Sequence, residues 1–147
     1  MGTRTVDVSL FDNKNRNKQV IQEYIDKFYS YVQIYTDASK DSGNKVGVAF
    51  TVPEFRVKIG KRVNNEVSVY TGELLAILLA VQWVEDIRPL RSVICSDFSS
   101  ALKSLQYNRS ESRPDILIEV QQTLYRIQMM GLSCFFMASS THWDKRK

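Results

Sequence analysis

The chain has 147 residues, of which 44% are hydrophobic and 24% charged, a balance that fits one globular domain and excludes a disordered segment. Its 20 Lys and Arg against 16 Asp and Glu give a formal charge of +4, which permits a polyanionic partner without requiring one. We find no apolar run of the about 20 residues that a membrane helix needs, and no apolar signal region. Cys95 and Cys134 lie in apolar stretches and suit a reducing compartment. We therefore expect an intracellular protein of the cytoplasm or nucleus, with no membrane partner.

The first part of the chain, residues 1–30, is predicted to precede the main domain at residues 31–147. Residues 1–16 are polar and show no sustained period, so we expect a loose arm there. From Gln19 to Tyr29, apolar side chains recur at helical spacing and predict a short helix that leads into the domain.

Three strands are predicted next, joined as an antiparallel meander. Alternating β-branched and aromatic residues predict strands over Tyr31–Asp37, Val46–Val52 and Phe55–Ile59. A polar turn separates the first two strands, and Pro53-Glu54 turns the chain before the third.

A hydrophobic helix follows the meander, over Thr71–Ile87. It is so rich in Leu and Ala that it must be buried on more than one side, and Thr71 is a candidate N-cap that would place Glu73 in the first turn. Further strands and helices then alternate: a strand at Ser92–Ser96, helices at Ser99–Gln106 and from Pro114 to Gly131, and a strand at Leu132–Met137. This order predicts an α/β fold with a five-stranded mixed sheet, in which the strand after the hydrophobic helix is parallel to the first.

Three acidic residues border the most hydrophobic stretches. Asp37 ends the first predicted strand, Glu73 opens the hydrophobic helix and Asp97 follows the fourth strand. If the first and fourth strands are neighbours, their carboxyl ends bring Asp37 and Asp97 together, and Glu73 joins them if the helix starts beneath that edge. Converging carboxylates repel one another unless protonated or neutralised, and their hard oxygens suit Mg²⁺ or Mn²⁺ and phosphoryl chemistry. The alternative is that each acid serves only as a turn or helix-end residue.

Three ordered motifs resemble the ribonuclease H family. They are Ile34–Lys40 (IYTDASK), Ser68–Ile77 (SVYTGELLAI) and Val93–Leu102 (VICSDFSSAL). The resemblance covers about Tyr31 to His142 and is closest to the ribonuclease H domain of non-LTR retrotransposon polyproteins. It implies a ribonuclease H-like fold, a five-stranded mixed sheet with a central helix.

The same resemblance implies a metal-dependent endonuclease that hydrolyses the RNA strand of RNA–DNA hybrids. In that family two Mg²⁺ ions are held by four acids, and Asp37, Glu73 and Asp97 match three of them, with Asp37 bridging both ions. Glu73 would also lie near the 2′-hydroxyl that distinguishes RNA from DNA. Contacts to the backbone of the hybrid are implied for Ser39, Lys40, Ser99 and Lys103, for which an ordinary surface position is the alternative.

The resemblance departs from the family near the end of the chain. His142 lies about where the family has a histidine that assists turnover, but the usual Trp-x-Pro-x-His run reads Ala138 to His142 (ASSTH). The sequence stops at Lys147, before the fourth acid and its terminal helix, so we expect impaired hydrolysis and an uncovered surface that permits self-association. The alternative function is a catalytically inactive ribonuclease H-fold module that binds nucleic acid or protein.

Overall fold

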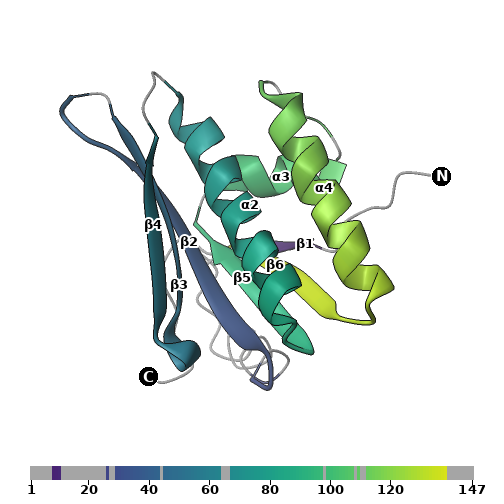
Figure 1. The fold of residues 1–147 in the computed structure, drawn as a ribbon. Coiled ribbons are helices and arrows are strands. Elements are labelled where there is room, and N and C mark those ends of the chain that lie inside the picture. Colours follow the sequence, from purple (N-terminus) through teal and green to yellow (C-terminus); the bar gives the residue numbers. More distant parts are fainter. Residues whose placement is uncertain are drawn as a thin grey trace.

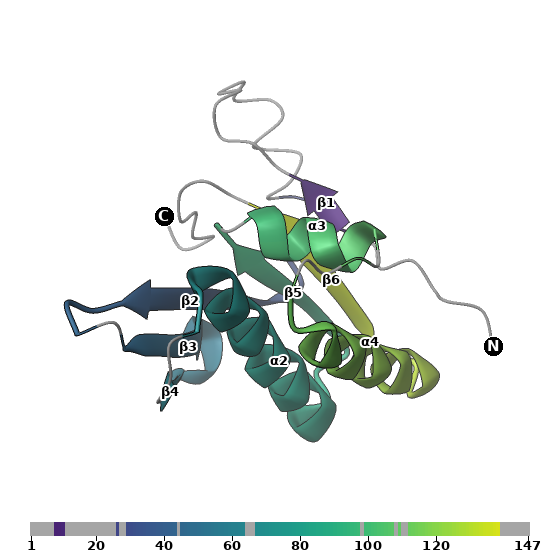
Figure 2. The same ribbon diagram turned by 90° about the horizontal axis from the view of Figure 1, so that it is seen from above.

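A six-stranded mixed sheet forms the centre of the fold, and helices cover one of its faces (Figures 1 and 2). The computed structural model describes residues 8–10, 26, 29–43, 45–63, 67–97, 99–107, 109 and 112–138. The strands are β1 (Val8–Leu10), β2 (Val32–Lys40), β3 (Val46–Val52), β4 (Val57–Val63), β5 (Arg91–Ser96) and β6 (Ser133–Ala138). The helices are the short 3-10 helix η1 (Pro53–Phe55) and the α-helices α2 (Val69–Ile87), α3 (Ser99–Tyr107) and α4 (Pro114–Met129).

The strand order in the sheet is β1-β6-β5-β2-β3-β4. Strands β2, β3 and β4 are antiparallel neighbours, whereas β2 with β5, β5 with β6, and β6 with β1 are parallel. The α/β class, the antiparallel meander and the parallel pairing of the first and fourth predicted strands are therefore confirmed.

Helix α2 is the central helix of the core. It packs on β2 and β3 and lies beside α4 on the same face of the sheet (Figure 1). Leu74, Ile77 and Val84 are fully buried in one hydrophobic cluster with Ile34 of β2 and Ile94 of β5. In the part of the chain that the structure describes, even this apolar helix falls short of what crossing a bilayer requires, and so do the others.

The strand β1 corrects the prediction for the start of the chain. Val8–Leu10 pairs in parallel with Phe136–Ala138 of β6, so the loose arm expected over residues 1–16 is wrong at these positions and the sheet has a sixth strand. Three residues are too few to show an alternating period, and the pairing with β6 defines the strand. Most of the helix predicted from Gln19 to Tyr29 lies outside the described residues.

Two further boundaries differ from the predictions. Ser68, not Thr71, is the N-cap of α2, because its Oγ accepts a hydrogen bond from the backbone N–H of Thr71 at 3.1 Å. Glu73 consequently lies beyond the first turn of the helix. Phe55 is part of η1 and places its ring 5.5 Å from that of Trp83, so the third predicted strand begins two residues later than expected, at Val57.

Candidate metal centre

The parallel ladder between β2 and β5 ends where the acidic residues begin. Its last paired residues are Tyr35 and Cys95, and Asp37 and Asp97 each follow two residues later. In this region Thr36 Oγ1 also donates to the carbonyl oxygen of Cys95 at 3.5 Å. The equal offset from the last pair carries both aspartates to the same edge of the sheet, as the sequence predicts.

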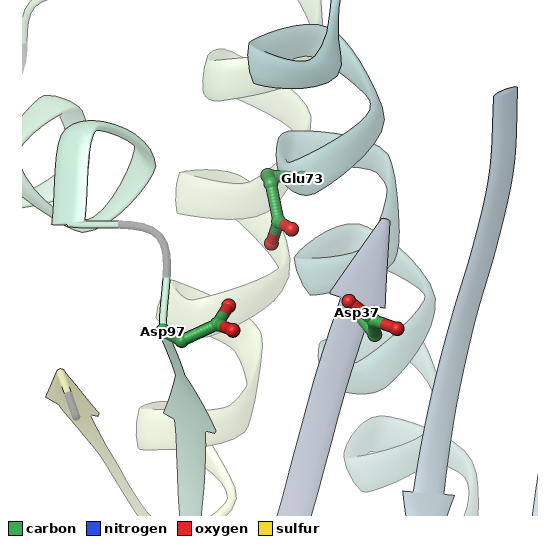
Figure 3. Close-up of side chains that lie close together, drawn as sticks. All are labelled: Asp37, Glu73 and Asp97. Carbon is green, nitrogen blue, oxygen red and sulfur yellow. The ribbon is translucent and has the colours of Figure 1, made fainter. Parts of the chain in front are cut away.

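Glu73 joins the two aspartates from above the sheet. Figure 3 shows its side chain descending from α2 toward the space between Asp37 on β2 and Asp97 at the end of β5. One carboxylate oxygen from each residue lies within 4.8 Å of the other two. The predicted convergence of these three acids is therefore confirmed.

Two hydrogen bonds hold the Glu73 carboxylate in this position. Its Oε1 accepts from the backbone N–H of Ala38 at 3.0 Å, and its Oε2 accepts from Ser96 Oγ at 3.4 Å. Glu73 is only 2% exposed, whereas both aspartates are exposed. The buried glutamate is thus fixed by β2 and β5, and the two aspartates face solvent.

Gly72 allows α2 to approach the sheet this closely. A Cβ atom at position 72 would lie 2.8 Å from Val46 Cγ1 and 3.2 Å from Ala38 Cβ, both closer than ordinary packing permits. Because Glu73 follows directly, the missing side chain of Gly72 brings the glutamate within reach of the Ala38 N–H.

The electrostatics of the cluster are unfavourable for three charged acids. Burial, and then the charges of Asp97 and Asp37, raise the pKa of Glu73 from 4.5 to about 7, against the opposing hydrogen bonds from Ala38 and Ser96. Within the described ranges the ion pairs join other residues, namely Arg62 with Asp41, Arg113 with Asp115 and Arg126 with Glu85. A divalent cation between the carboxylates would relieve this repulsion.

The donor set fits a hard divalent cation. All three groups offer carboxylate oxygens, two of them accessible from solvent, and Glu73 is already oriented by its hydrogen bonds. Oxygen-only sites of this kind suit ions such as Mg²⁺ and Mn²⁺ rather than zinc, which favours Cys and His. The two cysteines are free, and Cys95 is buried in β5.

The other predicted site residues are more dispersed. Ser39 and Lys40 are exposed at the end of β2, just beyond Asp37, and Lys103 is exposed on α3. Ser99 is the first residue of α3 and follows Asp97 by two positions, but its side chain is outside the described part of the structure. His142 also lies outside the described residues.

Sequence reasoning missed the two residues that support Glu73. Ser96 places a hydroxyl group at the end of an apolar strand, directly before Asp97. Gly72 is a poor helix former directly before Glu73. Both residues are unfavourable for the strand or helix that contains them. This mismatch is the feature of the sequence that could have identified them.

Comparison with known proteins does not extend this description. No protein-family model matches the chain, and no curated protein shows significant similarity to it. The functional inference therefore depends on the site itself and on the motifs that contain it.

Proposed function

We propose that this chain is a metal-dependent ribonuclease H-type endonuclease that hydrolyses the RNA strand of RNA–DNA hybrids. The observation that carries the proposal is the convergence of Asp37, Glu73 and Asp97, with ligand oxygens within 4.8 Å of one another. Each of the three lies in one of the motifs that resemble the ribonuclease H family. The mixed sheet with a central helix is compatible with the same family.

The cofactor we propose is Mg²⁺, with Mn²⁺ as a substitute. Asp37 and Asp97 would hold it from the exposed side of the cluster, and Glu73 from the buried side. A divalent ion bound there would supply Lewis-acid stabilisation of phosphate oxygens and a water of lowered pKa.

The chain's own residues prepare this chemistry. The N–H of Ala38 and the hydroxyl of Ser96 hold Glu73 in one orientation, so little reorganisation is needed when a cation arrives. The exposed aspartates leave the outer side of the cluster open to a phosphate group of the substrate. Ser39 and Lys40 are exposed at the end of β2 and Lys103 is exposed on α3, and all three are proposed contacts to the nucleic-acid backbone.

Cleavage of a fluorescent RNA–DNA hybrid, in Mg²⁺ or Mn²⁺, tests the proposal. We expect Asp37→Asn to reduce the cleavage rate by about a hundredfold or more, because it removes a ligand from the centre of the cluster. Asp115→Asn is the matched control: this aspartate is exposed on α4 and pairs with Arg113, so its variant should cleave like the wild type.

Metal binding is measured separately by thermal unfolding. A bound ion at a hundred times its dissociation constant stabilises the folded chain by about 2.7 kcal/mol, so Mn²⁺ should raise the midpoint for the wild type and for Asp115→Asn but much less for Asp37→Asn. Cleavage that survives Asp37→Asn unchanged would contradict the assignment of the site. If the wild-type chain binds the hybrid but does not cleave it, the proposed activity is wrong. The chain is then a nucleic-acid-binding module of the same fold.

A further inference from the structure

The meander of β2, β3 and β4 has a second face, which carries Asp37. Side chains alternate along each strand, and Ile34, Val48 and Phe50 point to the face that α2 covers. Asp37 and its cross-strand partner Ala49 consequently lie on the opposite face. We call this the second face of the meander.

The register of the three strands fixes which side chains share this second face. Three rows cross it from β2 to β4: Ser39–Gly47–Arg62, Asp37–Ala49–Gly60 and Tyr35–Thr51–Lys58. The middle row therefore leads from the metal centre to the edge of the sheet at Gly60. Arg62 and Lys58 stand on either side of its end.

The charged residues of β4 are all positive. Strand β4 carries Lys58, Lys61 and Arg62 and no acidic residue, and all three are exposed. Arg62 pairs with Asp41 at 3.0 Å, whereas Lys58 takes part in none of the ion pairs found among the described residues. Lys61 is the cross-strand partner of Val48 and thus points to the other face of the sheet.

We propose that Lys58 and Arg62 bind the phosphate backbone of a nucleic-acid strand that passes from Asp37 across β3 to the edge of the sheet at β4. This inference rests on the proposed function, because it takes the reacting phosphate to lie at Asp37. Neighbouring strands are about 4.8 Å apart, which places β4 about 10 Å from β2. The bound phosphate is therefore a few nucleotides from the cleaved bond.

Two other roles for these cations make different predictions. Lysines on an edge strand also prevent pairing with the edge of another molecule, a role that Lys61 would fulfil as well as Lys58. Arg62 ties β4 to the β2–β3 turn through Asp41, so its loss could act through the turn alone. Lys58 is therefore the informative position, and Lys61 is its matched control on the same strand.

The first measurement is the affinity for a fluorescent RNA–DNA hybrid as a function of salt concentration, in the Asp97→Asn background so that the RNA remains intact. Lys58→Ala should weaken binding by about fivefold to tenfold at moderate salt and reduce the slope of log K against log salt by about 0.9, the loss of one phosphate contact. Lys61→Ala should change neither quantity appreciably. Equal losses for both variants, or no loss for either, would overturn the inference.

A second measurement locates the contact along the strand. Uncharged methylphosphonate linkages are introduced one at a time into the hybrid, and the affinities of the parent and Lys58→Ala are compared. The two affinities should converge when one particular linkage, a few nucleotides from the cleaved bond, is neutral. A difference that persists at every position would contradict a contact between Lys58 and one phosphate.

These results are separable from the test of the proposed function. Loss of cleavage in Asp37→Asn concerns the metal centre, whereas the contrast between Lys58→Ala and Lys61→Ala is a binding measurement that needs no turnover. If the wild-type chain cleaves the hybrid but Lys58→Ala and Lys61→Ala bind it equally well, the proposed activity stands and only the backbone contact is wrong. If only Lys58→Ala weakens binding and the wild-type chain does not cleave the hybrid, the backbone contact stands and the proposed activity is wrong.

Discussion

The two ends of α2 each carry a glutamate, and the two residues have opposite surroundings. Glu73, near the amino end, is buried beside Asp37 and Asp97, which with its burial raise its pKa to about 7. Glu85, near the carboxyl end, receives hydrogen bonds from Arg126 of α4, which lower its pKa. Helix α2 thus carries one glutamate, Glu85, that is paired with an arginine, and another, Glu73, that lies among other acids.

The contrast separates an acid that links two helices from an acid in the candidate metal centre. Glu85 is only partly buried, and its pairing with Arg126 links α2 to α4 at the surface. Glu73 differs in each respect. Its carboxylate is buried, is oriented by hydrogen bonds from Ala38 and Ser96, and lies beside two negative charges instead of an arginine. Such an arrangement costs stability unless a cation from solution completes it, which makes it the candidate site.

The largest expected effect on stability is the pH dependence caused by Glu73. The unfolded chain has a glutamate of pKa near 4.5 and the folded chain one of about 7, so the folded state binds more protons between these values. The stabilisation is fully present below pH 4.5 and is lost as the pH rises through 7, on the order of 3 kcal/mol without metal. Chemical denaturation of the wild type in a chelator, across this pH range, measures the loss.

Glu73→Gln should flatten that dependence, and Glu85→Gln should leave it in place. Both variants replace one glutamate of α2, so every other titrating group is shared. Mn²⁺ should also reduce the loss at high pH, because it binds the deprotonated cluster. An unchanged pH dependence in Glu73→Gln would show that the unfavourable charge lies elsewhere.

The two glutamates also show how far sequence alone could reach. Periodicity and composition predicted the meander, α2 and the strand β5, and the parallel pairing of β2 and β5 then predicted where Asp37 and Asp97 meet. The strand β1 could not be predicted, since three residues have no usable period and their partner is more than 120 residues away. Ser96 and Gly72 hint at polar support for Glu73, but the hydrogen bonds from Ala38 and Ser96 depend on how closely α2 approaches the sheet, which the sequence does not define.

Gly72→Ala tests that close approach, with a smaller expected effect. The added methyl group would lie 2.8 Å from Val46 Cγ1, and Val46 is fully buried and cannot turn away. We expect a net destabilisation of about 1–2 kcal/mol, since the overpacking exceeds the gain in helix propensity from replacing glycine. Displacement of α2 should also weaken the hold of Ala38 on Glu73 and reduce the stabilisation by Mn²⁺.

Gly47→Ala is the matched control for this substitution. A Cβ atom at position 47 would come no closer than 3.7 Å to its nearest neighbour, Ser39 Oγ. Its variant should unfold at nearly the wild-type denaturant concentration and keep the response to Mn²⁺. If Gly72→Ala behaves in the same way, the missing side chain at position 72 does not set the position of Glu73.

The smallest expected effect belongs to the ion pair at the other end of α2. Glu85 and Arg126 are joined by two hydrogen bonds, but the arginine side chain is 51% exposed, so solvent and salt screen the pair. A double-mutant cycle of Glu85→Gln and Arg126→Gln, followed by thermal unfolding, should give a coupling of about 0.5–1 kcal/mol that falls in high salt. Glu85→Gln should cleave the hybrid like the wild type, because its pairing is completed within the chain and needs no ion. A coupling of several kcal/mol, or loss of cleavage in this variant, would mean that Glu85 also acts on the candidate metal centre. The distinction between the two glutamates would then fail.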